Sequence, residues 1–203
     1  MSYSSWYEAT DNAGLETLQR SLIDIEADTK YQRSYSPEIL PGLVQTLAYA
    51  RAILSKCTAV LGLPDDSEAT AAVRMQRQAV LDGPGHSFHM LIGEAALRRT
   101  VGDHAVMAAQ IRQLGDILTS RDNVEIGIIP LDAEFIGQAD NFVIHDESGV
   151  AIETVTGSVE TSGADEIALA VRTFDLLAGQ ARYGEHARAL LDRALAEHVG
   201  PGI

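Results

Sequence analysis

The sequence predicts a single α+β domain, in which a small mixed sheet of about four strands is flanked by N- and C-terminal helices. Apolar residues recur with helical spacing over residues 14–82 and again over 164–198, whereas the segments between residues 86 and 156 alternate with a period of two. The 203-residue chain is 46% hydrophobic, which is enough to bury roughly 70% of its unfolded surface as one unit. Residues 1–203 are therefore treated as one domain.

The N-terminal part reads as three helices. The first covers residues 14–33, and the second covers about 42–56, after a turn at a Pro-Gly pair. The third begins at Asp66 or Ser67, either of which suits an N-cap, and ends at a Gly-Pro-Gly turn at 83–85.

The central part changes period and predicts the sheet. A strand, a short helix, a longer helix and a second strand are followed by a hairpin, over residues 86–92, 94–100, 103–118, 123–129, 141–146 and 150–156. Asp103 is placed to cap the longer helix. Two further helices lie within residues 164–198.

Charge and composition exclude several classes of protein. The chain has 15 basic and 29 acidic residues and a formal charge of −14, so its field repels phosphate backbones, and we expect no direct nucleic-acid binding. Cys57 is the only cysteine, which excludes an intrachain disulfide and a cysteine-based metal cluster. No apolar run approaches the length that crosses a bilayer. We expect a cytoplasmic protein with no metal and no cofactor.

Standard catalytic motifs are missing from the sequence, which leaves no direct argument for an enzyme. If the chain is an enzyme, its acid–base residues are expected to be His89, Glu94, His145 and Glu153, because the predicted strands can bring them to one end of the sheet. Glu94 also has a structural interpretation, since a carboxylate in the first turn of a helix interacts well with the free amides there. For the histidines, the simpler interpretation is that they are isolated side chains at or near the surface.

The segment around residues 35–51 offers a candidate binding surface. An apolar stripe is predicted at Leu43, Leu47, Ala50 and Leu54, which leaves Gln45, Tyr49 and Arg51 on the outer face of the second helix. Tyrosine and arginine are enriched at the centres of interfaces. Arg74 and Arg77 on the third helix are secondary candidates to bind an anionic ligand or an acidic partner, although solvated helix faces that pair with nearby acids are the simpler interpretation of them.

The same segment resembles a signature of a large actinomycete family, PGLxQTxxYAR, matched here from Pro41 to Arg51. The resemblance continues in the RMQRQ run at 74–78, the EAALRRTVG run at 94–102 and beyond, from about Trp6 onward. The family comprises Xre-type transcriptional regulators, WhiJ-like or antitoxin-like, in which a DNA-binding domain precedes a long effector domain. The chain is similar to the effector domain, and the helix-turn-helix domain has no counterpart in it.

The resemblance implies a ligand- or partner-sensing domain of a transcriptional regulator that lacks its own DNA-binding module. The expected partner is a small protein or a small-molecule ligand, and a homodimer stays open. The alternative is a stand-alone enzyme that evolved from the same scaffold and acts on a small metabolite in a biosynthetic pathway.

Overall fold

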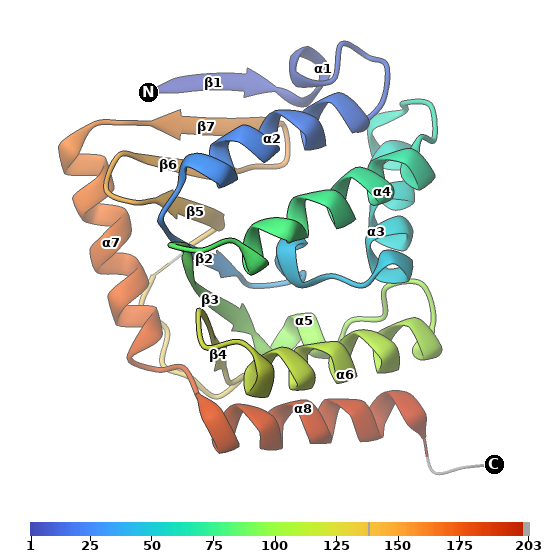
Figure 1. Ribbon diagram of the computed structural model, residues 1–203, viewed down its shortest axis with the longest axis vertical. Helices are drawn as coiled ribbons and strands as arrows, with labels where there is room; N and C mark the ends of the chain where they lie inside the picture. Colours follow the sequence, from blue (N-terminus) through green and yellow to red (C-terminus); the bar gives the residue numbers. More distant parts are fainter. Residues whose placement is uncertain (138, 201–203) are drawn as a thin grey trace.

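A computed structural model describes residues 1–137 and 139–200, so the last residues of the predicted domain lie outside the described part. The fold is mixed α+β and is built on one sheet of seven strands in the order β1-β7-β6-β5-β2-β3-β4 (Figure 1). The strands are β1 (Ser2–Ser5), β2 (Tyr31–Ser36), β3 (Ser87–Gly93), β4 (Val124–Ile129), β5 (Asn141–His145), β6 (Gly149–Glu153) and β7 (Gly157–Thr161).

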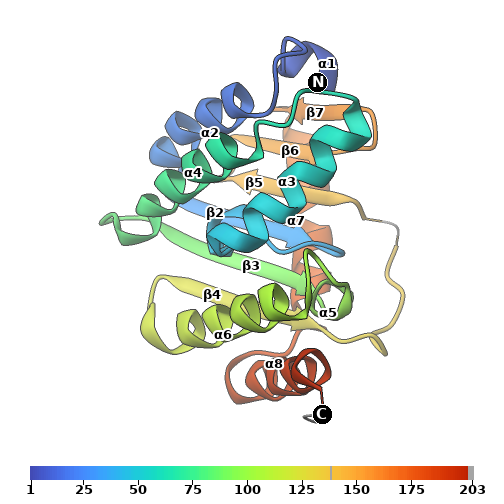
Figure 2. The same ribbon diagram turned by 90° about the vertical axis from the view of Figure 1, so that its right-hand side faces the viewer.

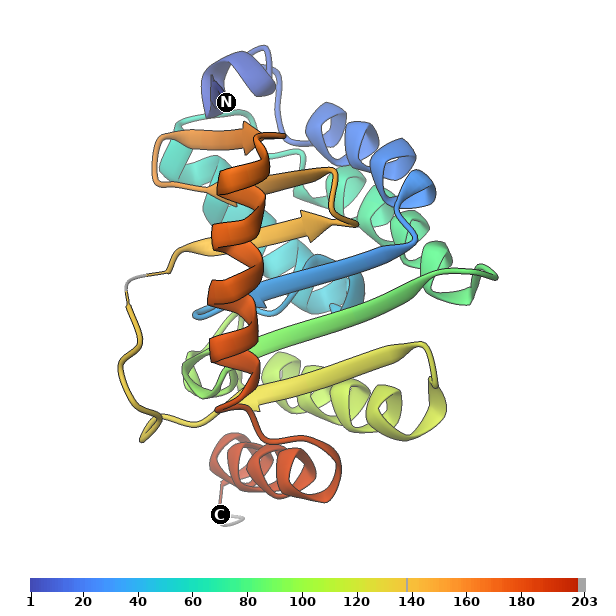
Figure 3. The ribbon, with the colours of Figure 1, turned by 90° about the vertical axis from the view of Figure 1, so that its left-hand side faces the viewer.

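Helices cover both faces of this sheet. Figure 2 shows α2, α3 and α4 on one side and α7 behind the strands, and in Figure 3 α7 crosses the opposite face. The helices are α1 (Trp6–Ala9), α2 (Glu16–Asp28), α3 (Leu47–Leu61), α4 (Ser67–Arg77), α5 (Glu94–Arg98), α6 (His104–Ser120), α7 (Ala164–Ala178) and α8 (Gly184–Val199), with short 3-10 turns η1 (Gly42–Val44) and η2 (Gln78–Asp82).

Strands β2, β3 and β4 form the parallel part of the sheet. The main core lies between β3, β4 and helices α6 and α8, and it includes fully buried Met90, Ile92, Leu114 and Ile128. The predicted strand–helix–strand unit is confirmed here, and Asp103 caps α6 as expected, since its Oδ1 accepts from Val106 N at 2.9 Å. A second core lies under α7, around Leu91, Phe142, Ile144 and Phe174 among others.

The α+β class is confirmed, but the prediction of about four strands is wrong, because the sheet has seven. Residues 31–36 fall within the region predicted as helical, yet they form β2, the strand that joins the parallel and antiparallel parts. This strand carries Gln32, Ser34 and Ser36 on one face, so it lacks the apolar alternation by which a buried strand is normally recognised. Strands β1 and β7 also lack this apolar alternation, because both are short and rich in serine or acidic residues, and the sequence pattern does not predict them.

Candidate functional site

One face of the sheet is apolar in one half and polar in the other. On the side of α2, α4 and α6, β3 and β4 present apolar residues that pack under α6. The neighbouring strand β2 presents Gln32, Ser34 and Ser36 to the same side, and these residues are only 6%, 3% and 3% exposed. Within the described part of the chain, Gln32 Oε1 and Ser34 Oγ are buried without a hydrogen-bond partner. Buried polar atoms normally have partners, so this half of the face is built to meet a polar group or water.

A hollow lies over the polar half of the sheet, between it and α2. Its volume is about 400 Å³, within the range of small-molecule sites. Residues from α2 and from the four antiparallel strands β1, β5, β6 and β7 with their turns line it, chiefly Leu22, Ile25, His145, Ala151, Glu160 and Ser162. The apolar wall therefore comes from α2 and the polar floor from the sheet.

His145 is held in one tautomer at the inner side of this hollow. The Thr29 hydroxyl donates to Ile25 O at 2.7 Å, so the same oxygen accepts from His145 Nδ1–H at 3.1 Å. The other nitrogen, Nε2, is then an unprotonated acceptor, and it has no hydrogen-bond partner in the part of the chain that the structure describes. Burial lowers the pKa of His145, and the acidic side chains of Glu26, Asp146 and Glu160 oppose this only in part. The lowered pKa keeps the ring neutral near pH 7.

Helix α2 is fastened to α4 by a buried polar network. Arg77 pairs with the Glu26 carboxylate, and both side chains are about 7% exposed or less. Gln19 Oε1 accepts from Arg77 and also from Arg74 Nε, the latter at 3.0 Å. Arg74 Nη1 donates to Gln45 Oε1 at 2.7 Å, which carries the network from α4 into the loop before α3. Burial, and then the neighbouring Arg77, lowers the pKa of Arg74 to about 10, so the guanidinium stays charged at neutral pH.

The residues of the sequence signature build that loop. Gln45 donates to Leu40 O at 2.7 Å, and Tyr49 Oη accepts from Leu40 N at 3.3 Å. Gln45 is 1% and Tyr49 0% exposed, so the predicted outer face is wrong for both. The physical reason is that the chain first makes the η1 turn and starts α3 only at Leu47, which rotates the helix and leaves Leu47 itself 48% exposed. Arg51 does lie on the surface, paired with Glu68 at 3.0 Å.

The structure does not bring together the four residues proposed for catalysis. His89 faces α7, on the side of the sheet opposite to His145, since the centroid of its ring lies 4.9 Å from that of the Phe174 ring on α7. Glu153 pairs with Asn141 at one end of the β5–β6 hairpin, whereas His145 pairs with Gly149 at the other end. A catalytic role for any of them stays a prediction.

Glu94, the fourth, is used structurally at the start of α5. Its carboxylate accepts from Leu131 N at 2.9 Å and from Arg98 Nη2 at 2.8 Å. Burial raises its pKa, but these hydrogen bonds outweigh burial and lower it. The preceding Gly93 has no room for a side chain, because a Cβ there would lie 2.4 Å from Pro37 O.

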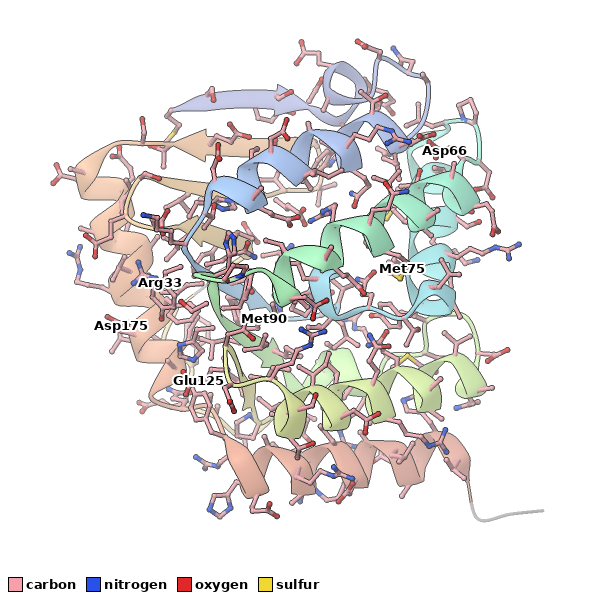
Figure 4. All side chains as sticks on the ribbon, viewed as in Figure 1. Arg33, Asp66, Met75, Met90, Glu125 and Asp175 are labelled. Carbon is pink, nitrogen blue, oxygen red and sulfur yellow. The ribbon has the colours of Figure 1, made fainter. Side chains whose placement is uncertain are left out.

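A second polar group lies under α7. Arg33, His89 and Glu125 are cross-strand neighbours on β2, β3 and β4, and Figure 4 shows Arg33, Glu125 and Asp175 close together beside α7. His89 Nε2 lies 2.9 Å from Tyr183 Oη, which also donates to Ala178 O at 3.2 Å. Burial lowers the pKa of His89. No group of three or more His, Cys, Asp or Glu residues suited to a metal ion occurs in residues 1–137 and 139–200.

Sequence reasoning found His145 but missed its surroundings in the hollow. Glu160 lies on β7, a strand that the sequence pattern does not predict, and Thr29 falls within the predicted helix 14–33, whereas α2 ends at Asp28. The recurrence of polar residues at Gln32, Ser34 and Ser36, with a period of two, was the available signal for a strand with one polar face. In the described residues, no helix is long and apolar enough to pass through a bilayer.

Comparisons with solved structures give only distant likenesses. The chain is similar to TrmBL2, an archaeal chromatin protein with a novel mode of DNA binding, at 11% identity and a TM-score of 0.43, over 85% of this chain and 53% of that one. It is also similar to NucT from Helicobacter pylori, at 11% identity and a TM-score of 0.46, over 90% of this chain and 98% of that one. The chain thus spans about half the length of the first, and neither likeness says what it binds.

A comparison with family models identifies the family of the chain. None of the curated proteins compared with the chain matches it. The model for a domain of unknown function, DUF5753, matches residues 19–193, which include most of α2, the signature loop, the buried arginines and the hollow-lining strands β5 to β7. The chain therefore belongs to the DUF5753 family.

Proposed function

We propose that this domain is the ligand-sensing part of a transcriptional regulator and that it binds a small molecule in the hollow under α2. The observation that carries the proposal is the hollow of about 400 Å³ whose floor is a polar sheet face with unpartnered buried atoms beside it. Gln32 is the cross-strand neighbour of His145, so a ligand that reaches past His145 comes close to these atoms. An apolar wall with a few convergent polar groups is the usual composition of a small-molecule site.

The buried network gives such a ligand a way to act at a distance. Leu22 and Ile25 line the hollow, while Gln19 and Glu26 on the same helix hold the arginines of α4. A ligand that shifts or stiffens α2 therefore changes the position or mobility of α4 and, through Arg74, of the loop at Gln45. The sensing surface and the responding surface are then different parts of the molecule, as a regulator requires.

The geometry favours this function over the enzyme alternative. The four acid–base candidates are spread over both faces and both ends of the sheet, and Glu94 is committed to backbone and Arg98 hydrogen bonds. It also favours a small molecule over a protein partner at the signature segment, because Gln45 and Tyr49 are buried. A protein partner that responds to the sensed ligand remains part of the proposal.

A test of the proposed function compares three proteins by thermal unfolding against a library of soluble metabolites. Ala151→Phe fills the hollow, and Ala59→Phe makes the same change at an exposed site on α3. We expect some compounds to raise the unfolding temperature of the wild type and of Ala59→Phe but not of Ala151→Phe, because a ligand stabilises only the state that binds it. Ligands that stabilise Ala151→Phe as much as the wild type would refute a site in the hollow, and so would the absence of any stabilising compound.

A further inference from the structure

We infer that the hollow under α2 takes a ligand with a protonated amine on an apolar body. This inference rests on the proposed function and adds the chemical class of the ligand. The lining holds hydrogen-bond acceptors and apolar surface, and it contains no lysine or arginine.

Two side chains that line the hollow, His145 and Glu160, and a third beside it, Gln32, offer hydrogen-bond acceptors. His145 Nε2 is left unprotonated because Nδ1–H is used on Thr29, whose own proton is used on Ile25 O. The Glu160 carboxylate lies on the same floor. Gln32 Oε1, beside His145 on β2, is buried and takes no hydrogen bond from the described residues. Three acceptors in one region favour a group with several donors, and an ammonium group has three N–H bonds.

The charges around the hollow favour a cation. Its lining contains a glutamate and no lysine or arginine. Met1, which carries the N-terminal amino group, also belongs to the lining, but it is 82% exposed, so solvent and salt screen its charge. Ile25 belongs to the last turn of α2, where the helix dipole is negative. The chain as a whole carries a formal charge of −14, which raises the local concentration of cations.

The apolar wall sets the rest of the ligand. Leu22 and Ile25 stand one turn apart on α2, and Ile25 is 41% exposed, so their apolar surface faces the hollow without a protein partner over it. A hydrocarbon body of a few carbons or a single ring covers such a surface, and the affinity rises with each CH₂ group that it buries.

The test uses three six-carbon probes that differ only in the head group: hexylamine, hexanol and hexanoate. Calorimetric titration gives the affinity, and methyl NMR signals of Leu22 and Ile25 give the location. We expect hexylamine to bind most tightly and to shift both methyl signals, with hexanol weaker and hexanoate weakest. Glu160→Gln should weaken hexylamine by about two- to fivefold, as for an exposed ion pair, without weakening hexanol. Glu185→Gln, the same change on the exposed start of α8, should have no effect.

His145→Asn removes the Nε2 acceptor but keeps an N–H that can reach Thr29, and we expect it to weaken hexylamine by about two- to tenfold. Hexanoate that binds at Leu22 and Ile25 more tightly than hexylamine would overturn the amine assignment and leave the hollow as a ligand site. Failure of hexylamine to shift these methyl signals would also overturn the inference. The proposed function is then judged separately, by whether any library compound stabilises the wild type and not Ala151→Phe.

Discussion

Replacing Arg77 by methionine tests whether the buried network holds α2 in place. The Arg77 and Glu26 side chains are 7% and 6% exposed, so the variant leaves a carboxylate in the interior without its cation. Removal of one partner of a buried ion pair destabilises a protein by about 3–5 kcal/mol, and the hydrogen bond from Arg77 to Gln19 is lost as well. This is a large fraction of the typical total stability of about 5–15 kcal/mol.

Urea unfolding followed by circular dichroism measures the effect, with two variants as references. Arg51→Met removes an exposed pair whose side chains are 62% and 71% exposed, and we expect it to lose no more than about 1 kcal/mol. The double variant Glu26→Leu/Arg77→Met removes both charges, so it should recover most of the loss. An Arg77→Met variant no less stable than Arg51→Met would refute the reasoning, and so would a double variant as unstable as the single one.

Three further predictions concern the Tyr49 hydroxyl, the two histidines of lowered pKa and the binding of DNA. Tyr49→Phe removes the hydroxyl that accepts from Leu40 N, and we expect a loss of about 0.5–1.5 kcal/mol in urea unfolding; no loss at all would mean that the ring and not the hydroxyl holds the loop. Burial lowers the pKa of both His89 and His145 from 6.5, so the unfolded chain binds more protons below that value. The two histidines should therefore leave the free energy of unfolding unchanged above about pH 6.5 and reduce it as the pH drops toward the lowered pKa values. The double variant His89→Gln/His145→Asn should show a shallower fall with pH. Equal slopes for the variant and the wild type would exclude these two residues as the cause. Finally, a labelled DNA duplex should show no specific binding at physiological salt, because the formal charge is −14; tight, sequence-specific anisotropy changes would contradict this expectation.

Elements with strong local signals could be predicted from the sequence. The helix α6 begins at its Asp103 cap, and β3 and β4 alternate or run apolar because they are buried in the main core. Strand β2 could not be recognised in this way, since its stability comes from pairing with β3 and β5 and from packing that includes a polar interior. Tertiary pairing overrode a local pattern that reads as loop or helix end.

The candidate site was harder to predict for a related reason. Periodicity places Gln45 and Tyr49 on an outer face only if the helix starts at residue 42, and the η1 turn before α3 changes that phase. His145 could be singled out as a chemical residue, but its neighbours Thr29 and Glu160 lie 116 and 15 residues away in the chain. Only the topology of the sheet brings them to one hollow.

Hydrogen–deuterium exchange of the wild type, with and without the most stabilising compound from the metabolite library, tests the central claim most directly. The account predicts that the ligand slows exchange in α2 and, through the buried arginines, in α4 and the loop at Gln45, while α8 stays unchanged. Protection confined to α7, or a bound ligand that leaves α2 and α4 unaffected, would contradict it.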